Sequence, residues 1–160
     1  IGVLSREDAY ALGAVGPTAR ASGVGIDLRK TGYAAYGRLS FSPVVETAGD
    51  CHARCVVRVK EIFTSIDLIR QAIAKIPDGP VEEKPKKNPE GDYFARSEQP
   101  RGELVHYVKG DGSRHLVRSR IRTPTLTNLP SLVRMLKGCN LADVPVIVLS
   151  IDPCIGCAER

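Results

Sequence analysis

The stretch "CHARCVVRVKEIFTSIDLIRQAIAKI", residues 51–76, decides what kind of fold this chain adopts. Its apolar side chains recur at alternating steps of four and three residues, at Cys55, Val59, Ile62, Ile66, Ile69, Ile73 and Ile76. This spacing places them on one face of a helix of about seven turns. Pro77, Gly79 and Pro80 follow and stop the helix. The pattern predicts a long helix from Gly49 to Ile76 whose apolar face is buried against the rest of the chain.

Two cysteines begin this helix. Cys51 and Cys55 are separated by one helical turn, a spacing that is compatible with a shared metal ion. Thiols at the start of an apolar helix face are more often buried in the core. We therefore expect both thiols to be buried and neither to be a metal ligand.

Shorter elements are expected on both sides of the long helix. "SREDAYALG", residues 5–13, predicts a short helix capped by Ser5. The glycine-rich residues 13–32 predict an ordered loop pressed against another surface. We expect that surface to lie outside this chain, so residues 13–30 should be mobile in the chain alone. Residues 77–92 are charged and proline-rich, which predicts a surface loop. Residues 102–108 and 114–121 predict a β-hairpin around "KGDGS", residues 130–137 a helix, and "VPVIVLSI", residues 144–151, a buried strand.

These elements predict one domain, or part of one, over residues 1–160. The fold class is α+β and mainly helical. It has a long central helix, a β-hairpin or small sheet, and a C-terminal strand that leads to a buried C-terminus. Because the first residue is Ile1 and not Met, we expect the chain to be part of something longer.

Composition narrows the function classes. The net charge is +5, the aromatic residues make up 5%, and the basic residues are dispersed, so a nucleic-acid-binding surface is not expected. Five cysteines do not pair off as in a secreted disulfide framework, which favours a reducing compartment. The longest apolar run is too short to cross a bilayer. Any membrane association is therefore expected to occur through partners.

The last residues contain a second cysteine pair. In "DPCIGC", Pro153 fixes the backbone before Cys154, and Gly156 permits a tight approach before Cys157. Two thiolates directed into one small site suit a soft metal such as zinc, copper(I), iron or nickel. An incidental or disulfide-linked pair is equally compatible with the spacing. Two cysteines are half of a tetrahedral site, to be completed by Cys51 with Cys55, by His52, or by residues outside this chain.

Two further stretches offer hydrogen-bond donors. Arg101 lies between Pro100 and Gly102, so its guanidinium is held in a turn and can present a fixed pair of donors to an anion. "RTPTLTN", residues 122–128, offers Arg122, Thr123 and Thr125 around a proline. Without a ligand, Arg101 would be an ordinary surface arginine in a turn, and residues 122–128 would be a strand end with local capping by hydroxyl groups.

Three motifs in order, "PRGEL.HY", "RTPT..N" and a terminal "DPC..C..R", resemble the large, catalytic subunit of [NiFe] hydrogenases. "GPTARASGVGIDLRK" and "GDCHARCVVRVKEI" are similar to its group 4, energy-converting branch, which includes Ech-type, CO-induced and formate-hydrogenlyase enzymes and is related to the 49-kDa-type subunit of complex I. The resemblance extends over essentially the whole chain. It implies reversible H2 oxidation and proton reduction at a Ni–Fe centre whose iron carries cyanide and carbonyl ligands.

The resemblance also implies roles for individual residues. Cys154 would be a terminal nickel ligand and Cys157 would bridge nickel and iron. Arg101 would stand over the open coordination position, with Asp152 as a nearby carboxylate. Pro100 and Thr125 would line the pocket of the iron's diatomic ligands, Thr125 by hydrogen bonding. The short tail after the cysteines would reflect a C-terminus buried at the metal site.

The chain departs from that family pattern in one respect. The family has a second cysteine pair near its N-terminus with a proton-relaying glutamate, and no second C-x-x-C occurs here. The resemblance therefore implies the C-terminal half of the subunit, which alone holds two of four thiolate ligands. It also implies a small iron–sulfur subunit as electron partner, membrane subunits, and a cytoplasmic location on the inner face of the cell membrane.

Two other functions stay open at this level. The first is a complex I-like, quinone-site subunit in which the cysteines are relics; the terminal pair argues against it, since quinone-reducing relatives lack those thiols. The second is a small zinc protein that uses Cys51, Cys55, Cys154 and Cys157.

Overall fold

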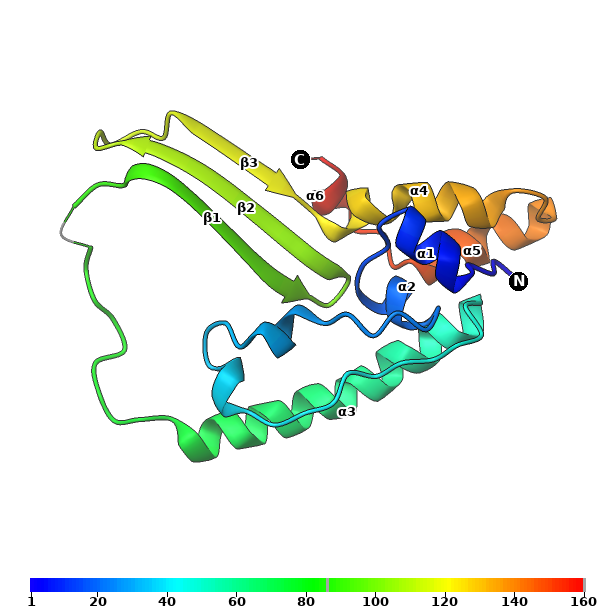
Figure 1. Cartoon of the computed structure of the whole chain (residues 1–160), viewed down its shortest axis with the longest axis horizontal. Helices are drawn as coiled ribbons and strands as arrows, with labels where there is room; N and C mark the ends of the chain where they lie inside the picture. The colour runs from blue at the N-terminus through cyan, green and yellow to red at the C-terminus, as the bar shows by residue number, and fades with distance from the viewer. Residues whose placement is uncertain (86, 160) are drawn as a thin grey trace.

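The long helix forms where the sequence predicts it. In the computed structural model, which describes residues 1–85 and 87–159, helix α3 spans Cys51–Lys75 and runs along one edge of the molecule (Figure 1). The Asp50 side chain caps it by accepting a hydrogen bond from the Ala53 N–H at 2.8 Å. Helix α1, Arg6–Ala11, also forms as predicted, and Ser5 Oγ accepts from the Asp8 N–H at 3.0 Å. Local capping and helical periodicity thus decide both elements.

The predicted hairpin is part of a three-stranded antiparallel sheet. Strands β2, Gly102–Asp111, and β3, Arg118–Arg122, form the hairpin, and β1, Glu90–Gln99, pairs with the other edge of β2. Gln99 pairs with Gly102, so β1 and β2 are joined by a tight turn at Pro100 and Arg101. The prediction of a surface loop up to residue 92 was wrong for the first residues of β1, because their strand conformation depends on pairing with β2.

The glycine-rich loop contains short helices and packs on other parts of this chain, whereas the sequence led us to expect it to pack outside the chain. Helix α2 spans Gly16–Arg20, and the 3-10 helices η1 and η2 span Leu28–Thr31 and Tyr36–Arg38. Helix α4 spans Pro124–Leu136 and begins six residues before the predicted start at Pro130. The "RTPT" stretch therefore joins the end of β3 at Arg122 to the start of α4, where Pro124 occupies the first helical turn and needs no N–H partner.

The predicted C-terminal strand was wrong. After the 3-10 helix η3, Leu141–Asp143, residues Val144–Ser150 form helix α5, and Ile155–Ala158 form the short helix α6. Pro145 lies in the first turn of α5, while Ile147 and Ile151, one turn apart, are both buried. Helical burial on one face outweighs the β-propensity of the valines and isoleucines. Residues 154–159 are half-buried or exposed, not buried as predicted, and Arg160 lies outside the described residues.

The core lies where the four short helices meet the start of α3. It consists of Leu4, Ala9, Ala19, Val24, Cys51, Leu132, Met135, Ile147 and Ile151. In Figure 1 this end of the molecule holds α1, α2, α4 and α5, whereas the sheet and the far end of α3 extend away from it. Among the described residues, no helix is both long and apolar enough to cross a bilayer.

The apolar face of α3 is not buried, which corrects the prediction. We define this face as Val59, Ile62, Ile66, Ile69, Ile73 and Ile76, whose exposed fractions are 54%, 57%, 41%, 58%, 69% and 77%. The helix rests on the chain through a different face that includes Val57 and Leu68. Cys51 is buried as expected, but Cys55 is exposed. Periodicity identifies an apolar face, but it does not say which part of a protein covers it.

Candidate functional site

The second cysteine pair lies in a short segment, Asp152–Cys157, which we call the thiol segment. It begins where α5 ends, at Asp152, whose φ of 55° is the left-handed conformation that non-glycine residues rarely adopt. Two threonines from the start of α4 hold the segment: Thr125 Oγ1 accepts from the Cys154 N–H at 3.2 Å, and Thr123 Oγ1 donates to the Cys157 carbonyl at 2.7 Å. Both threonines are buried, with exposed fractions of 4% and 2%. The "RTPT" stretch therefore positions the thiols.

Arg101 is tied to the same segment by two hydrogen bonds. Its Nε donates to the Asp152 carbonyl at 2.7 Å, and its Nη2 donates to Asp152 Oδ1 at 3.1 Å. The two side chains form an ion pair that is about one-third exposed on the arginine and 43% exposed on the aspartate. The guanidinium is thus oriented by a two-point contact, while part of it remains open to a ligand.

The two thiols differ electrostatically. The Cys157 thiol and backbone stabilise the Cys154 thiolate, and the Arg101 charge adds to this, so the pKa of Cys154 is lowered. Burial and the neighbouring Cys154 sulfur raise the pKa of Cys157. Because the thiolate is the form that binds metals, a lowered pKa within this pair favours metal binding.

The Arg101 turn is pressed against the glycine-rich loop. A Cβ on Gly16 would lie 2.4 Å from the Gly102 Cα and 2.5 Å from the Arg101 carbonyl oxygen, so the two backbones are in direct contact. Asn128, which is 1% exposed, holds this loop: its Oδ1 accepts from the Val15 N–H at 3.0 Å and its Nδ2 donates to the Val15 carbonyl at 3.2 Å. The predicted ordered loop therefore packs on the turn that carries Arg101.

The structure brings most of the predicted site residues together. Arg101, Asp152, Thr125 and Cys154 are linked by the hydrogen bonds described above. Pro100 is exposed at the turn and lines a cavity of about 530 Å³ together with Asp152 and Arg58 of α3. His52 is exposed at the start of α3.

The described residues contain no cluster of three or more His, Cys, Asp or Glu side chains suited to a metal ion. Cys51 and Cys55 therefore do not join the second pair, and the four-cysteine zinc site is not formed within residues 1–85 and 87–159. As a donor set, two adjacent thiols of which one has a lowered pKa fit half of a soft-metal site. The other ligands of such a site have to come from elsewhere.

A buried charge cluster borders the site and was not predicted. Arg20, which is 1% exposed, donates to Glu61 of α3 at 2.7 Å and to Glu98 of β1 at 2.8 Å. Asp27 pairs with Arg29 at 2.6 Å. Burial raises the pKa of Glu98, while the two carboxylates outweigh burial and raise the pKa of Arg20. The only sequence signal was the presence of charged residues inside a glycine-rich loop.

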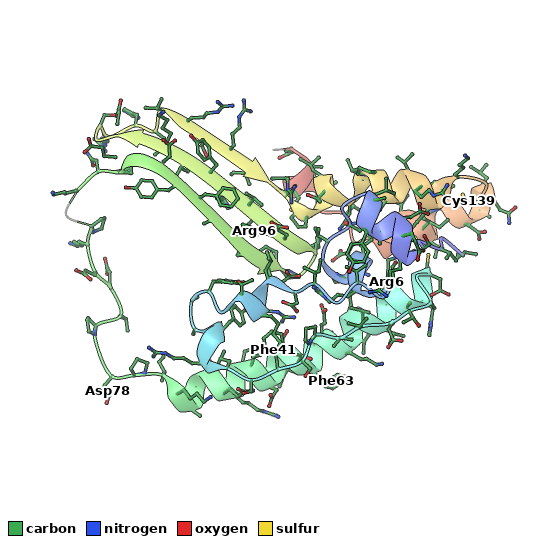
Figure 2. All side chains as sticks on the ribbon, viewed as in Figure 1. Arg6, Phe41, Phe63, Asp78, Arg96 and Cys139 are labelled. Carbon is green, nitrogen blue, oxygen red and sulfur yellow. The ribbon has the colours of Figure 1, made fainter. Side chains whose placement is uncertain are left out.

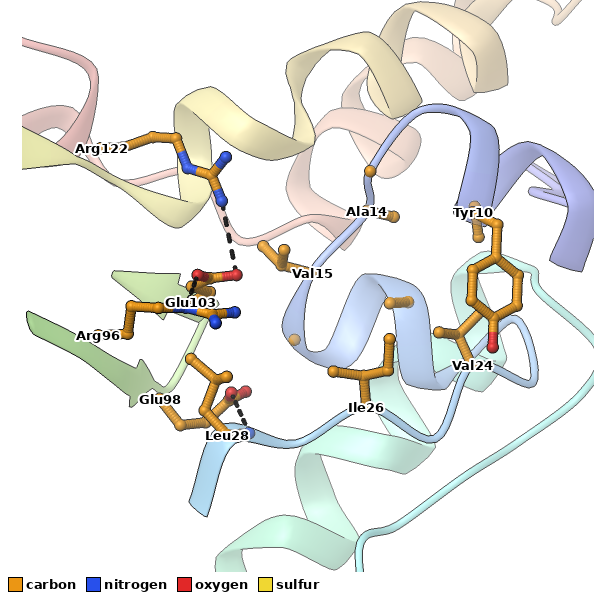
Figure 3. A pocket seen from close by; sticks show the side chains of 14 residues that line it. Tyr10, Ala14, Val15, Val24, Ile26, Leu28, Arg96, Glu98, Glu103 and Arg122 are labelled. Atoms are coloured by element: carbon orange, nitrogen blue, oxygen red, sulfur yellow. Dashed lines mark hydrogen bonds and ion pairs between the residues drawn. The ribbon is translucent and has the colours of Figure 1, made fainter. Parts of the chain in front are cut away.

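A second cavity lies on the other side of the glycine-rich loop. It has a volume of about 290 Å³ and is lined by small apolar residues such as Ala14 and Val24. Glu103 closes one end between Arg96 and Arg122, at 2.5 Å and 3.5 Å (Figure 3). Both arginines pair with this one glutamate, which offsets one of their two positive charges.

Comparison with known proteins places this arrangement in a family. The chain matches the family described as the 49-kDa subunit of the respiratory-chain NADH dehydrogenase, in two overlapping segments, residues 1–88 and 83–160. The chain belongs to this family. The predicted resemblance to the energy-converting hydrogenases and to this 49-kDa-type subunit is thereby confirmed, because both kinds of protein are among its relatives.

The 49-kDa-type relatives include hydrogenases and quinone oxidoreductases. A carbon monoxide-induced hydrogenase of Rhodospirillum rubrum is 45% identical over 162 residues, covering 100% of this chain and 45% of that protein. The alpha subunit of a membrane-bound hydrogenase of Pyrococcus furiosus is 38% identical, with 100% and 42% covered. An NADH-quinone oxidoreductase subunit of Herpetosiphon aurantiacus is 42% identical, with 100% and 45% covered.

A solved structure confirms the fold of this 49-kDa-type chain. A chain of the membrane-bound sulfane sulfur reductase, an archaeal respiratory membrane complex, superimposes with a TM-score of 0.91 at 36% identity. The match covers 100% of this chain and 46% of the other. The chain thus spans somewhat less than half the length of these relatives.

Proposed function

We propose that this chain is the C-terminal part of the catalytic subunit of an energy-converting [NiFe] hydrogenase, which interconverts H2 with protons and electrons. One observation carries the proposal: Cys154, with a lowered pKa, and Cys157 lie in one segment that is bonded to Arg101 through Asp152. The hydrogenase relatives, at 45% and 38% identity, add support.

In this proposal the metal site is shared with residues outside the chain. Cys154 and Cys157 would be the ligands from this chain, which would contribute two soft thiolate donors. A bound nickel–iron centre supplies the Lewis-acidic, redox-active position at which H2 is held. The Sγ atom of Cys154 is the base from this chain that accepts a proton.

The side chains around the two thiols orient the Arg101 guanidinium and provide fixed hydrogen-bond donors. The two-point contact with Asp152 fixes the Arg101 guanidinium, whose exposed part directs donors toward the open position of the site. Fixed donors aimed at developing charge lower a reaction barrier without reorganisation. Pro100 and Thr125 would line the pocket of the iron's cyanide and carbonyl ligands, and Thr125 holds the Cys154 backbone.

The proposed surroundings follow from the same assignment. Electrons pass to a small iron–sulfur subunit, because the chain has no motif of its own for such a cluster. Membrane subunits complete the complex, which places this chain on the cytoplasmic face of the cell membrane. The solved relative is part of a respiratory membrane complex, which supports this arrangement.

Two relatives define the alternatives to this reaction. The quinone oxidoreductase subunits, at up to 42% identity, support a quinone-site role in which the thiols hold no metal. The sulfane sulfur reductase, at 36% identity, supports reduction of a sulfur compound at the same thiol segment.

The test uses the purified complex that contains the complete large subunit. We expect nickel and iron in the wild-type complex, loss of nickel in Cys154→Ser, and unchanged nickel in Cys139→Ser, whose half-buried thiol follows α4. Arg101→Lys should keep both metals but lower H2 evolution by about 100-fold, because lysine lacks the planar two-pronged donor.

Two results would overturn the assignment, and a third would remove the role of one residue. A wild-type complex that contains no nickel and reduces quinone would establish the first alternative. A complex that evolves no H2 but reduces polysulfide would establish the second. Near-normal H2 evolution by a fully metallated Arg101→Lys enzyme would remove the role given to Arg101.

A further inference from the structure

The apolar face of α3 is a long row of exposed side chains with no cover in the described structure. Its six members are between 41% and 77% exposed and follow one another along about five turns. Phe63, at 68% exposed, widens the row, and its label in Figure 2 lies on the side of α3 away from the sheet. Single exposed apolar residues are normal on a protein surface, but a contiguous row of this length marks an interaction surface.

The row continues into a cleft that ends at the functional site. Ile62, Ile66 and Ile69 line the cavity of about 530 Å³, and Pro100 and Asp152 line its other side. Whatever covers α3 therefore also closes this cleft beside the thiol segment.

The cleft contains donors that lack acceptors. Arg58 uses Nη1 to donate to the Arg54 carbonyl at 3.2 Å, but its buried Nε and Nη2 have no hydrogen-bond partner among the described residues. Burial lowers the pKa of Arg58, and the charge of Asp152 only partly offsets this. A buried guanidinium with two unmet donors is costly unless an acceptor, best a carboxylate, is brought to it. The cover therefore needs an apolar face and an acidic group at the level of Arg58.

The relatives indicate where such a cover comes from. These two relatives are more than twice as long as this chain, since the match covers 45% of the R. rubrum hydrogenase and 46% of the solved reductase chain. The Ile1 carbonyl accepts from the Cys51 N–H at 3.1 Å, so polypeptide joined to Ile1 begins beside the first turn of α3. The remaining polypeptide thus has both the length and the starting point to lie along this helix.

We propose that the apolar face of α3 is the docking surface for the remaining half of the large subunit. An amphipathic helix of that half lies along Val59–Ile76 and places an acidic side chain in the cleft beside Arg58. The surface is therefore internal to the complete subunit, and it closes the cleft beside Pro100 and Asp152. The proposal rests on family membership and not on hydrogenase activity.

The docking test compares the chain alone with a chimera. In the chimera, this chain replaces the matching 162 residues of the R. rubrum hydrogenase subunit. Ile62→Cys and Ile69→Cys, at positions 57% and 58% exposed, are labelled with iodoacetamide and followed by peptide mass mapping. Val133→Cys on α4, at a position 69% exposed, is the matched control.

We expect all three cysteines to label at similar rates in the chain alone. In the chimera, labelling at positions 62 and 69 should slow by at least about 10-fold, while position 133 stays unchanged. Equal labelling at the three positions of a folded chimera would overturn the proposal. Protection that already exists in the chain alone and is lost on dilution would show that a second copy is the occupant, which also overturns it. If the chimera does not fold, the same labelling at the aligned positions of the R. rubrum subunit decides between these outcomes.

Arg58→Met tests the carboxylate separately. In the chain alone, Arg58→Met removes buried N–H donors that have no acceptor among the described residues, so the thermal midpoint of unfolding should stay unchanged or rise. In the chimera it leaves the carboxylate unpaired, so the midpoint should fall by about 5 °C. A change of the same sign in both proteins would refute the carboxylate. Because neither readout needs metal or H2, this proposal and the proposed function can fail independently.

Discussion

The contact between Gly16 and the Arg101 turn gives a sharp prediction, because the chain contains a matched control. Gly13 and Gly16 have nearly the same backbone conformation, with φ of +65° and +64°. An alanine at either position lowers the unfolding free energy by about 1 kcal/mol, because its Cβ disfavours the left-handed backbone conformation. A Cβ on Gly13 would have nothing within 4 Å, whereas a Cβ on Gly16 would lie 2.4 Å from the Gly102 Cα. The difference between the two variants therefore isolates the close approach.

The structure sets the size of that difference. Ordinary contact begins at 3.4 Å, so the two backbones would have to separate by about 1 Å. Forced shifts of this kind in a packed region cost about 2–3 kcal/mol. We expect Gly13→Ala to lose about 1 kcal/mol of unfolding free energy and Gly16→Ala about 3–4 kcal/mol.

Urea unfolding of the two variants and the wild type measures this difference. In the complete enzyme, Gly16→Ala should also displace Arg101 from Asp152 and lower turnover by about 100-fold while metal content is kept. Equal losses of stability in the two variants would refute the reasoning, since it would mean that the loop does not press on the turn.

Three further predictions follow from the hydrogen bonds, thiols and charges described above. Asn128→Ala removes two hydrogen bonds to the glycine-rich loop and should lower stability by about 2 kcal/mol and the midpoint by about 4–8 °C, whereas Val133→Ala on the same helix should change neither. Serine at both Cys51 and Cys55 should leave the nickel content of the complete subunit unchanged; a loss as large as that of a Cys154→Ser variant would make them ligands. Burial opposes ionisation of Asp27, but the charges of Arg29 and Arg20 outweigh burial and lower the pKa of Asp27. The Asp27 carboxylate therefore stabilises the fold above about pH 4, and this stabilisation is lost at lower pH. The stability difference between wild type and Asp27→Asn should accordingly shrink as the pH falls below about 4 in urea titrations, and a difference independent of pH would contradict this.

Local signals predicted the parts of the fold that local interactions decide. The spacing of the isoleucines gave the limits of α3 to within two residues at either end, and Ser5 marked the start of α1. The turn residues at 109–113 marked the hairpin between β2 and β3. These features depend on neighbours within a few residues, which the sequence displays directly.

Features that depend on distant contacts were missed or misread. Strand β1 needs β2 as a partner, and "VPVIVLSI" became helix α5 because Ile147 and Ile151 fill the core from one helical face. The thiol segment was identified from its residues, yet the role of Asn128 and the charge cluster around Arg20 required the folded chain, since their partners lie 41–113 residues away. The roles of Pro100, Arg101, Thr125, Asp152 and the two thiols at a metal remain predictions for the complete subunit.

Arg54 connects parts of the chain that are far apart in sequence. Its side chain is fully buried and donates to the Gly2 carbonyl at 2.7 Å, to the Gly49 carbonyl at 2.8 Å and to Ser150 Oγ at 2.9 Å. Position 150 is 96 residues from Arg54 and lies just ahead of the thiol segment.

This connection has a consequence for the order of folding. Contacts of such sequence separation cost loop-closure entropy before they stabilise the fold, so we expect them to form late. The cysteines therefore reach their final positions only after α3 and α5 have docked through Arg54. Weakening this arginine would chiefly accelerate unfolding, as expected for contacts absent from the transition state. We therefore expect the thiol segment to be assembled late and released early.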